Sequence, residues 1–133
     1  MESRAQAAAE LKRSGKMNCA QAVACTYCDL AGTDEETMKK ACRAFAVGMG
    51  GMEATCGAIA GAAVVLGFMY DNQGKSMKAS KYVISKFKEQ NGATQCRDIK
   101  GVDDGVLKRE CPDCVADAAR FLEEIIEANE ADK

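Results

Sequence analysis

Cysteine is the residue type with the most chemistry to offer in this 133-residue chain, which contains eight cysteines and no histidine. Without imidazole, the chain has no Ser/His/Asp or Cys/His nucleophile system, no histidine-ligated zinc site and no c-type haem attachment motif. The chemistry left to it is thiol–disulfide exchange, thiolate ligation of a metal, or carboxylate chemistry. The positions of the cysteines therefore indicate which of these chemistries the chain can carry out.

Three cysteines are expected where helices begin. If Asn18 caps a helix, Cys19 is its first residue, and if Thr55 caps another, Cys56 takes the same position. Cys111 precedes the only proline, a residue favoured at a first helical position, so Cys111 is expected as a cap. Unpaired amides and the helix dipole favour negative charge there. We therefore expect each of these thiols to have a pKa below the reference value of about 8.5.

Cys111 also opens a C-x-x-C motif that closes at Cys114. Such a pair at the start of a helix places two sulfurs near each other and suits thiol–disulfide exchange, with Cys114 as the resolving thiol. Ligation of a metal or cluster and an incidental spacing are the alternatives for this pair.

Three further cysteines have simpler interpretations. Cys42 shares a helical face with apolar residues and is expected in the core. Cys25 and Cys28 lie one turn apart within a helix, where a disulfide would be poorly shaped. Metal ligation by these two together with the C-x-x-C pair is an alternative, although the separation is unlike that of a zinc ribbon.

The elements that position the thiols are expected to be helices, because the chain has one proline and long Ala-, Lys-, Glu- and Met-rich runs without strand alternation. Caps and glycines delimit six helices, at residues 2–13, 19–30, 34–46, 55–70, 76–90 and 112–129. Thr33 and Glu36 have the spacing of a capping box before the third. The connection 93–110 has little helical pattern. We expect an all-α, single-domain helical bundle over residues 1–133.

Residues 54–69 are apolar or small nearly all the way round, which predicts the buried central helix of the bundle. The segment is shorter than the roughly 20 residues that span a bilayer, so we expect no membrane span. Gly57 and Gly61, one turn apart, allow another backbone or a bound group to approach closely. They are therefore candidate cofactor-binding positions as well as packing positions.

The run from Cys56 to Gly61, Cys-Gly-Ala-Ile-Ala-Gly, resembles the CGAxxG signature of a family of putative redox-active proteins. That family is named for the pattern Cys, Gly-Cys-Ala-x-x-Gly, Cys, Cys. The match extends along nearly the whole chain, with Cys19 as the leading cysteine and Cys96 and Cys111 as the third and fourth. The resemblance implies a joint redox role for these four cysteines, and it assigns none to the other four.

One position departs from the family's name. The residue before Cys56 is Thr55 rather than glycine, and this change leaves the order of the cysteines intact.

Two functions of different classes agree with these observations. The first is a redox protein in which Cys19, Cys56, Cys96 and Cys111 converge at one end of the bundle and cycle between dithiol and disulfide. The second is a binding module in which the same four thiolates hold an iron–sulfur cluster or another thiophilic metal, without catalysis of its own. A helical interaction domain with idle thiols is a third.

The composition of the chain bears on its binding partners and on its cellular location. A net charge of −2 lacks the basic footprint of a nucleic-acid-binding domain. The first residues lack the features of a signal peptide, so we expect a cytoplasmic protein with thiols that are reduced, metal-bound or cycling. Lysines gather at residues 75–88 and carboxylates at 123–132. Both runs are typical of solvated helix faces, and docking of an acidic redox partner protein is the alternative for the lysines.

Overall fold

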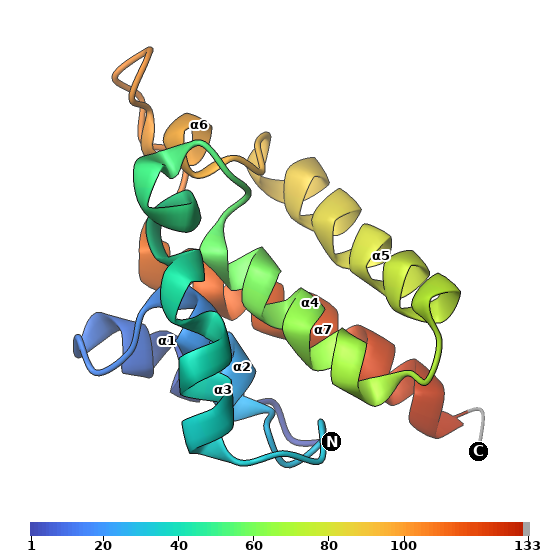
Figure 1. Ribbon diagram of the computed structural model, residues 1–133. Helices are drawn as coiled ribbons and strands as arrows, with labels where there is room; N and C mark the ends of the chain where they lie inside the picture. The colour runs from blue at the N-terminus through green and yellow to red at the C-terminus, as the bar shows by residue number, and fades with distance from the viewer. Residues whose placement is uncertain (132–133) are drawn as a thin grey trace.

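The protein is built from helices, as the computed structural model of residues 1–131 shows (Figure 1). Its α-helices are α1 (Ala5–Arg13), α2 (Cys19–Thr26), α3 (Glu35–Cys42), α4 (Gly57–Met69), α5 (Gln73–Asn91), α6 (Cys96–Lys100) and α7 (Cys111–Ala131). A 3-10 turn, η1 (Arg43–Phe45), and a π-type turn, η2 (Gly48–Met52), lead from α3 to α4. Within residues 1–131 there is no strand, so the expected all-α bundle is confirmed. Asp132, which ends the acidic run, lies outside the described residues.

Helices α4 and α7 run side by side through the middle of the molecule (Figure 1). Helix α2 packs on both, α5 covers another side, and α1 lies along α7. The fully buried side chains include Tyr27 of the turn after α2, Phe87 of α5, and Leu122 of α7. The core is built mainly from α2, α4, α5 and α7, and α1 and α3 add a few buried residues to it. No helix in the described part of the chain has the length and apolar character needed to cross a membrane.

The central helix was expected from residues 54–69, and α4 is buried over most of its length. Its glycine at position 61 faces α2 directly. A Cβ atom at Gly61 would overlap the carbonyl oxygen of Ala20 and lie 3.0 Å from the Cα atom of Ala20. The backbones of α2 and α4 therefore touch at this point, which only glycine permits.

The predicted start of α2 is confirmed. The side chain of Asn18 accepts a hydrogen bond from the Gln21 backbone N–H at 2.8 Å, and Gln21 Oε1 accepts one from the Asn18 N–H at 3.1 Å. The capping box predicted before α3 is wrong. Asp34, not Thr33, is the cap, because its carboxylate accepts the backbone N–H of Thr37 at 2.7 Å.

The starts of two other helices differ from expectation. Thr55 does not cap α4, because it forms an antiparallel bridge with Gln95, and the cap is Cys56. Cys111 is the first residue of α7 rather than its cap. The connection expected to lack helix contains α6. A five-residue helix is too short to show an apolar period, which is why the sequence pattern did not reveal it.

The Gly61 contact predicts opposite effects for two glycine substitutions in α4. Gly61→Ala should lower the free energy of unfolding by about 1–3 kcal/mol, because the new methyl group must push α2 away. Gly67→Ala is the matched control, since a Cβ at the exposed Gly67 meets nothing within 4 Å. It should raise the free energy of unfolding by about 0.5–1 kcal/mol, the ordinary helical advantage of alanine. Urea denaturation measures both, and equal effects would contradict the packing described.

Candidate functional site

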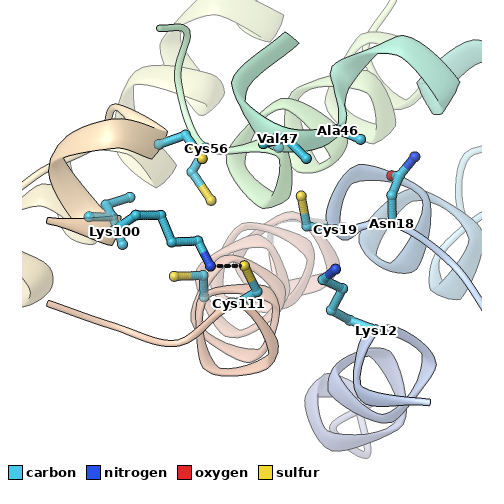
Figure 2. Close-up of a pocket in the computed structure, with 12 residues that line it drawn as sticks. Lys12, Asn18, Cys19, Ala46, Val47, Cys56, Lys100 and Cys111 are labelled. Atoms are coloured by element: carbon cyan, nitrogen blue, oxygen red, sulfur yellow. Dashed lines mark hydrogen bonds between the residues drawn. The ribbon is translucent and has the colours of Figure 1, made fainter. Parts of the chain in front are cut away.

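Five cysteines line one cavity of about 270 Å³ at one end of the bundle (Figure 2). The structure brings together Cys19, Cys56, Cys96 and Cys111, as the sequence predicted, and Cys114, the candidate resolving thiol of the C-x-x-C motif, lies in the same cavity. The redox or metal-binding roles assigned to them stay predictions. Beside the thiols, the cavity is lined by Lys12, Asn18, Ala46, Val47, Gly57, Ile99 and Lys100.

Each of the four family-matching cysteines stands at the start of a different helix. Cys19, Cys96 and Cys111 are the first residues of α2, α6 and α7, and Cys56 is the cap of α4. The N-terminal ends of these helices therefore meet at the cavity. Their unpaired amides and dipoles make the surroundings of the thiols electropositive.

Two backbone hydrogen bonds join the segments that carry Cys56 and Cys96. The N–H of Cys56 donates to the carbonyl of Thr94 at 2.7 Å, and the N–H of Cys96 donates to the carbonyl of Ala54 at 3.0 Å. The start of α4 and the start of α6 are thereby held together, although 40 positions of sequence separate the two cysteines. This pairing also explains why α6 lies beside η2 in Figure 1.

The segment over the cavity has an unusual backbone. Val47, Met49 and Met52 have φ angles of 54°, 62° and 65°. This left-handed conformation costs about 1–3 kcal/mol for a non-glycine residue. Gly48, between them, has φ 56°, and a Cβ there would lie 2.8 Å from Cys96 Cβ and 2.9 Å from the Ala54 carbonyl oxygen. The strained turn thus brings its backbone close against the thiol cluster.

The two glycines of the CGAxxG run make room for other parts of the protein. A Cβ at Gly57 would overlap Cys19 Sγ and lie 2.9 Å from the carbonyl oxygen of Phe45. Gly61 makes room for the backbone of α2, as described above. The close approach predicted at both positions is therefore made by α2, joined at Gly57 by η1. Contact of Gly57 with a bound group stays a prediction, since this residue also lines the cavity.

An ion pair fixes the chain just before α7. Asp117 is fully buried in α7 and accepts from Arg109 Nε at 2.9 Å, and Arg120 and Asn91 also bind it. Because Arg109 lies two residues before Cys111, this network holds the first turn of α7, with its two cysteines, against the cavity. A buried carboxylate left without these partners would be strongly destabilising.

Cys56 has the environment of a reactive thiolate. The adjacent Cys114 thiol is the largest cause that lowers the pKa of Cys56, and it outweighs the burial that opposes ionisation. The backbone N–H groups of Ala58 and Ile59, in the first turn of α4, lower the pKa further, and so does the positive charge of Lys100. The same interaction, with burial, strongly raises the pKa of Cys114. Of these two neighbours, Cys56 is therefore the thiol that ionises more readily, and Cys114 is the one that keeps its proton.

Cys19 does not follow the expectation for a helix start. Burial raises the pKa of Cys19, the negative charge of Cys56 adds to this, and the amide of Val47 and the charge of Lys12 offset only part of it. Burial and the charge of Cys56 also raise the pKa of Cys96. The expectation that each helix-start thiol ionises more readily is therefore wrong for Cys19, because desolvation exceeds the effect of the helix end.

Two lysines complete the site. Lys100 of α6 donates a hydrogen bond to Cys111 Sγ, and the side chain reaches across the cavity in Figure 2. Burial is the largest single influence on Lys100 and opposes its charge, but the bond to Cys111 and the negative charges of the surrounding thiols together outweigh it, so the pKa of Lys100 is raised. Lys12 enters from α1, next to Cys19 (Figure 2). Sequence reasoning missed Lys12, because no motif connects α1 with the cysteines.

The remaining cysteines lie away from the cavity. Cys42 is fully buried, as expected, and burial raises its pKa to about 11. Burial, with the charge of Glu35, also raises the pKa of Cys25 to about 11. Cys25 and Cys28 do not line the cavity that holds the C-x-x-C pair. Their joint metal ligation with that pair is therefore wrong, because the fold keeps the two pairs apart.

The thiols suit a soft metal ion by their chemistry, since thiolates bind zinc, copper(I) and iron–sulfur clusters. Their arrangement does not fit one. Nowhere in residues 1–131 are three or more Cys, Asp or Glu side chains placed to hold an ion. A cluster held by Cys19, Cys56, Cys96 and Cys111 would require these side chains to rearrange.

Comparison with known proteins gives one match. The family model described as "Putative redox-active protein (C_GCAxxG_C_C)" matches residues 17–125. This range includes all five cavity cysteines and Lys100, and it excludes Lys12. No curated protein and no solved structure matches the chain.

The opposite pKa directions of Cys56 and Cys19 predict different alkylation rates. Both side chains are 7% exposed and line the same cavity, so access is matched. With limiting iodoacetamide at pH 7, Cys56 should be labelled at least about tenfold faster than Cys19, because each pKa unit changes the thiolate fraction tenfold. The rate at Cys56 should also level off at a lower pH. Mass spectrometry of peptides from the reduced protein measures both.

The other thiols should also differ in their alkylation rates. Cys111 is less buried and should join Cys56 among the reactive thiols, whereas Cys25 and Cys42 should be labelled last. Labelling of all eight cysteines at one rate in the folded protein would contradict the electrostatic description of the site.

Proposed function

The chain belongs to the C_GCAxxG_C_C family of putative redox-active proteins, and from this membership and the geometry of its cavity we propose that it carries out thiol–disulfide exchange. Cys56 is the attacking thiolate and Cys114 is the resolving thiol. The observation that carries the proposal is the pairing of these two neighbours, in which Cys114 lowers the pKa of Cys56 while its own is raised.

The first step transfers one sulfur of the substrate to the protein. The Cys56 thiolate attacks a substrate disulfide, the substrate S–S bond breaks, and its electron pair leaves on a thiolate that takes up a proton. A mixed disulfide between Cys56 and the substrate forms. Lys100, whose charge stabilises the Cys56 thiolate, also faces the negative charge that develops on the leaving sulfur.

The second step depends on a change in the environment of Cys114. The Cys56 thiolate is the main cause, together with burial, that keeps Cys114 protonated. Once Cys56 is in a mixed disulfide, that negative charge is gone and the Cys114 thiol loses its proton more readily. Cys114 then attacks Cys56 Sγ, the second substrate thiolate leaves, and a Cys56–Cys114 disulfide remains. Two protein thiols have been oxidised and one substrate disulfide reduced.

Cys111 connects the buried pair with the exterior in this proposal. It is half-buried, whereas the other four cavity cysteines are buried, and it lies one helical turn before Cys114. We assign to it the exchange with an external dithiol. The Cys111 thiolate attacks Cys114 Sγ, the Cys56 thiolate leaves, and a Cys111–Cys114 disulfide forms. One thiolate of the external dithiol then attacks Cys111 Sγ and displaces Cys114, and its second thiolate attacks the sulfur bound to Cys111, so that Cys111 leaves as a thiol and the external dithiol becomes a disulfide. A redox partner protein in the cytoplasm would supply this dithiol. The lysines of α5 would serve as its docking face, if the partner is acidic.

Substitution of Cys114 tests the division of roles. Cys114→Ser should trap the mixed disulfide on Cys56 after reaction with bis(2-hydroxyethyl) disulfide, because no resolving thiol remains. The serine hydroxyl preserves the size and the hydrogen-bonding proton of the thiol. The unsubstituted protein should instead lose two thiols without an adduct. Intact mass and peptide mass spectrometry distinguish the two products.

Two further variants make this test specific. Cys56→Ser should abolish adduct formation at the cavity, and Cys28→Ser, which removes a thiol outside the cavity, should behave like the unsubstituted protein. A Cys114→Ser protein that still forms an internal disulfide without an adduct would contradict the assignment of the resolving thiol.

Metal analysis tests the competing function. Protein purified without air should be colourless and contain far less than one iron or zinc per chain, because the thiols are not arranged around an ion. Oxidation with diamide should then remove free thiols in pairs. Visible absorbance with stoichiometric iron and sulfide, or one firmly bound zinc, would replace the proposal by the thiolate-ligated binding module.

A further inference from the structure

The thiol cavity carries an unbalanced positive charge. Lys12 and Lys100 are half-buried in its wall, and no Asp or Glu of the described chain lines it. The ion pairs formed within residues 1–131 involve other cations. Arg97, the cation nearest to Lys100 in sequence, pairs with Asp103 at 2.8 Å and does not line the cavity. Two lysines therefore face the thiols without carboxylate partners.

The thiols of the cavity do not neutralise the positive charge of both lysines. Lys100 donates to Cys111, and its charge also favours the Cys56 thiolate. Lys12 is next to Cys19, whose pKa is nevertheless raised, so this thiol stays protonated near neutral pH. Half-burial of an ammonium group without a partner is unfavourable. An anion entering from solvent would supply the missing charge beside Lys12.

The cavity also limits the size of what can reach Cys56. Cys56 is 7% exposed and Cys114 is 2% exposed. The volume of about 270 Å³ is below the roughly 300–1,000 Å³ of sites that hold drug-sized ligands. A disulfide in a folded protein would have to bring two chain segments into this space. A small molecule meets no such obstacle.

We propose that the substrates of the cavity are small disulfides that carry carboxylates, and that Lys12 and Lys100 select them by charge. This rests on the exchange reaction proposed above and names its substrate class. A carboxylate of the disulfide pairs with Lys12 while one of its sulfurs lies against Cys56. The electrons and protons follow the two steps already given: two protein thiols become a disulfide, and the substrate leaves as two thiols.

Three small disulfides of similar size and different charge test the proposal: 3,3′-dithiodipropionate, bis(2-hydroxyethyl) disulfide and cystamine. The loss of protein thiols gives a rate constant for each, which is divided by the rate constant for the same disulfide with free 2-mercaptoethanol. This ratio removes intrinsic reactivity. The anion should be preferred to the neutral disulfide by about tenfold, and the cation should be slowest. Added salt should reduce the preference.

Variants of Lys12 distinguish selection of anionic disulfides from a general effect of Lys12 on the reactivity of the cavity thiols. Lys12→Met should remove most of the anion preference, Lys12→Glu should favour cystamine, and Lys12→Arg should keep the preference. Lys16→Met is the matched control, because Lys16 is exposed, close in sequence and outside the cavity lining, and its loss changes the net charge equally. Circular dichroism checks that each variant is folded.

The outcomes are distinct. Reaction of the unsubstituted protein with all three disulfides at equal normalised rates would overturn selection by charge while leaving the exchange function intact. An anion preference that Lys12→Met and Lys12→Glu both retain would likewise overturn the role of Lys12. No reaction with any of the three would overturn the exchange function itself. A disulfide in a folded protein, tested in parallel, should react more slowly than dithiodipropionate, and equal rates would overturn the size restriction.

Discussion

The close contact of α2 with α4 is the constraint on which the thiol site depends. With no side chain at Gly61, the backbone of Ala20 lies directly against α4. One turn earlier along α4, the absence of a side chain at Gly57 makes room for Cys19 Sγ. Cys19 and Cys56 consequently enter the same cavity from different helices. The glycines of the CGAxxG run thus position one cysteine beside another, and the cysteine of the run supplies the thiolate.

The thiols show how burial and helix position compete. Cys56 and Cys19 are equally buried at the starts of helices, and their pKa values move in opposite directions. The difference comes from neighbours: Cys56 has the Cys114 thiol and Lys100, whereas Cys19 has the negative charge of Cys56. Desolvation in a low-dielectric cavity magnifies both influences. One negative charge is therefore favoured among these thiols, and a second is opposed.

That asymmetry gives the cluster a direction of reaction. In the proposed exchange, the thiolate is the nucleophile and the protonated thiol beside it is the resolving thiol. When the thiolate forms a mixed disulfide, its negative charge is lost and the pKa of the resolving thiol falls. The strained turn at Val47 and Gly48, the paired backbones before α4 and α6, and the Arg109–Asp117 ion pair all hold the walls in place around them. Strain and buried charge are tolerated where the surrounding packing is strong.

The sequence by itself determined the features that depend on local interactions. The helical class, the N-cap at Asn18, the buried α4 and the core position of Cys42 follow from short-range hydrogen bonding and apolar periodicity. The order of the family cysteines identified four of the five thiols of the cavity. The C-x-x-C motif identified the fifth, Cys114. Only the tertiary structure paired Cys114 with Cys56 and brought Lys12 from α1 to the cluster.

Tertiary structure also decided where α4 begins and which thiol ionises. The cap of α4 moved to Cys56 because the segment before it pairs with residues 94–96, and the same pairing precedes α6. The pKa of Cys19 rose, contrary to the rule for helix starts, because burial and the charge of Cys56 act through space. Desolvation and Coulomb interactions depend on distances across the fold, and these distances are not encoded in any local sequence pattern.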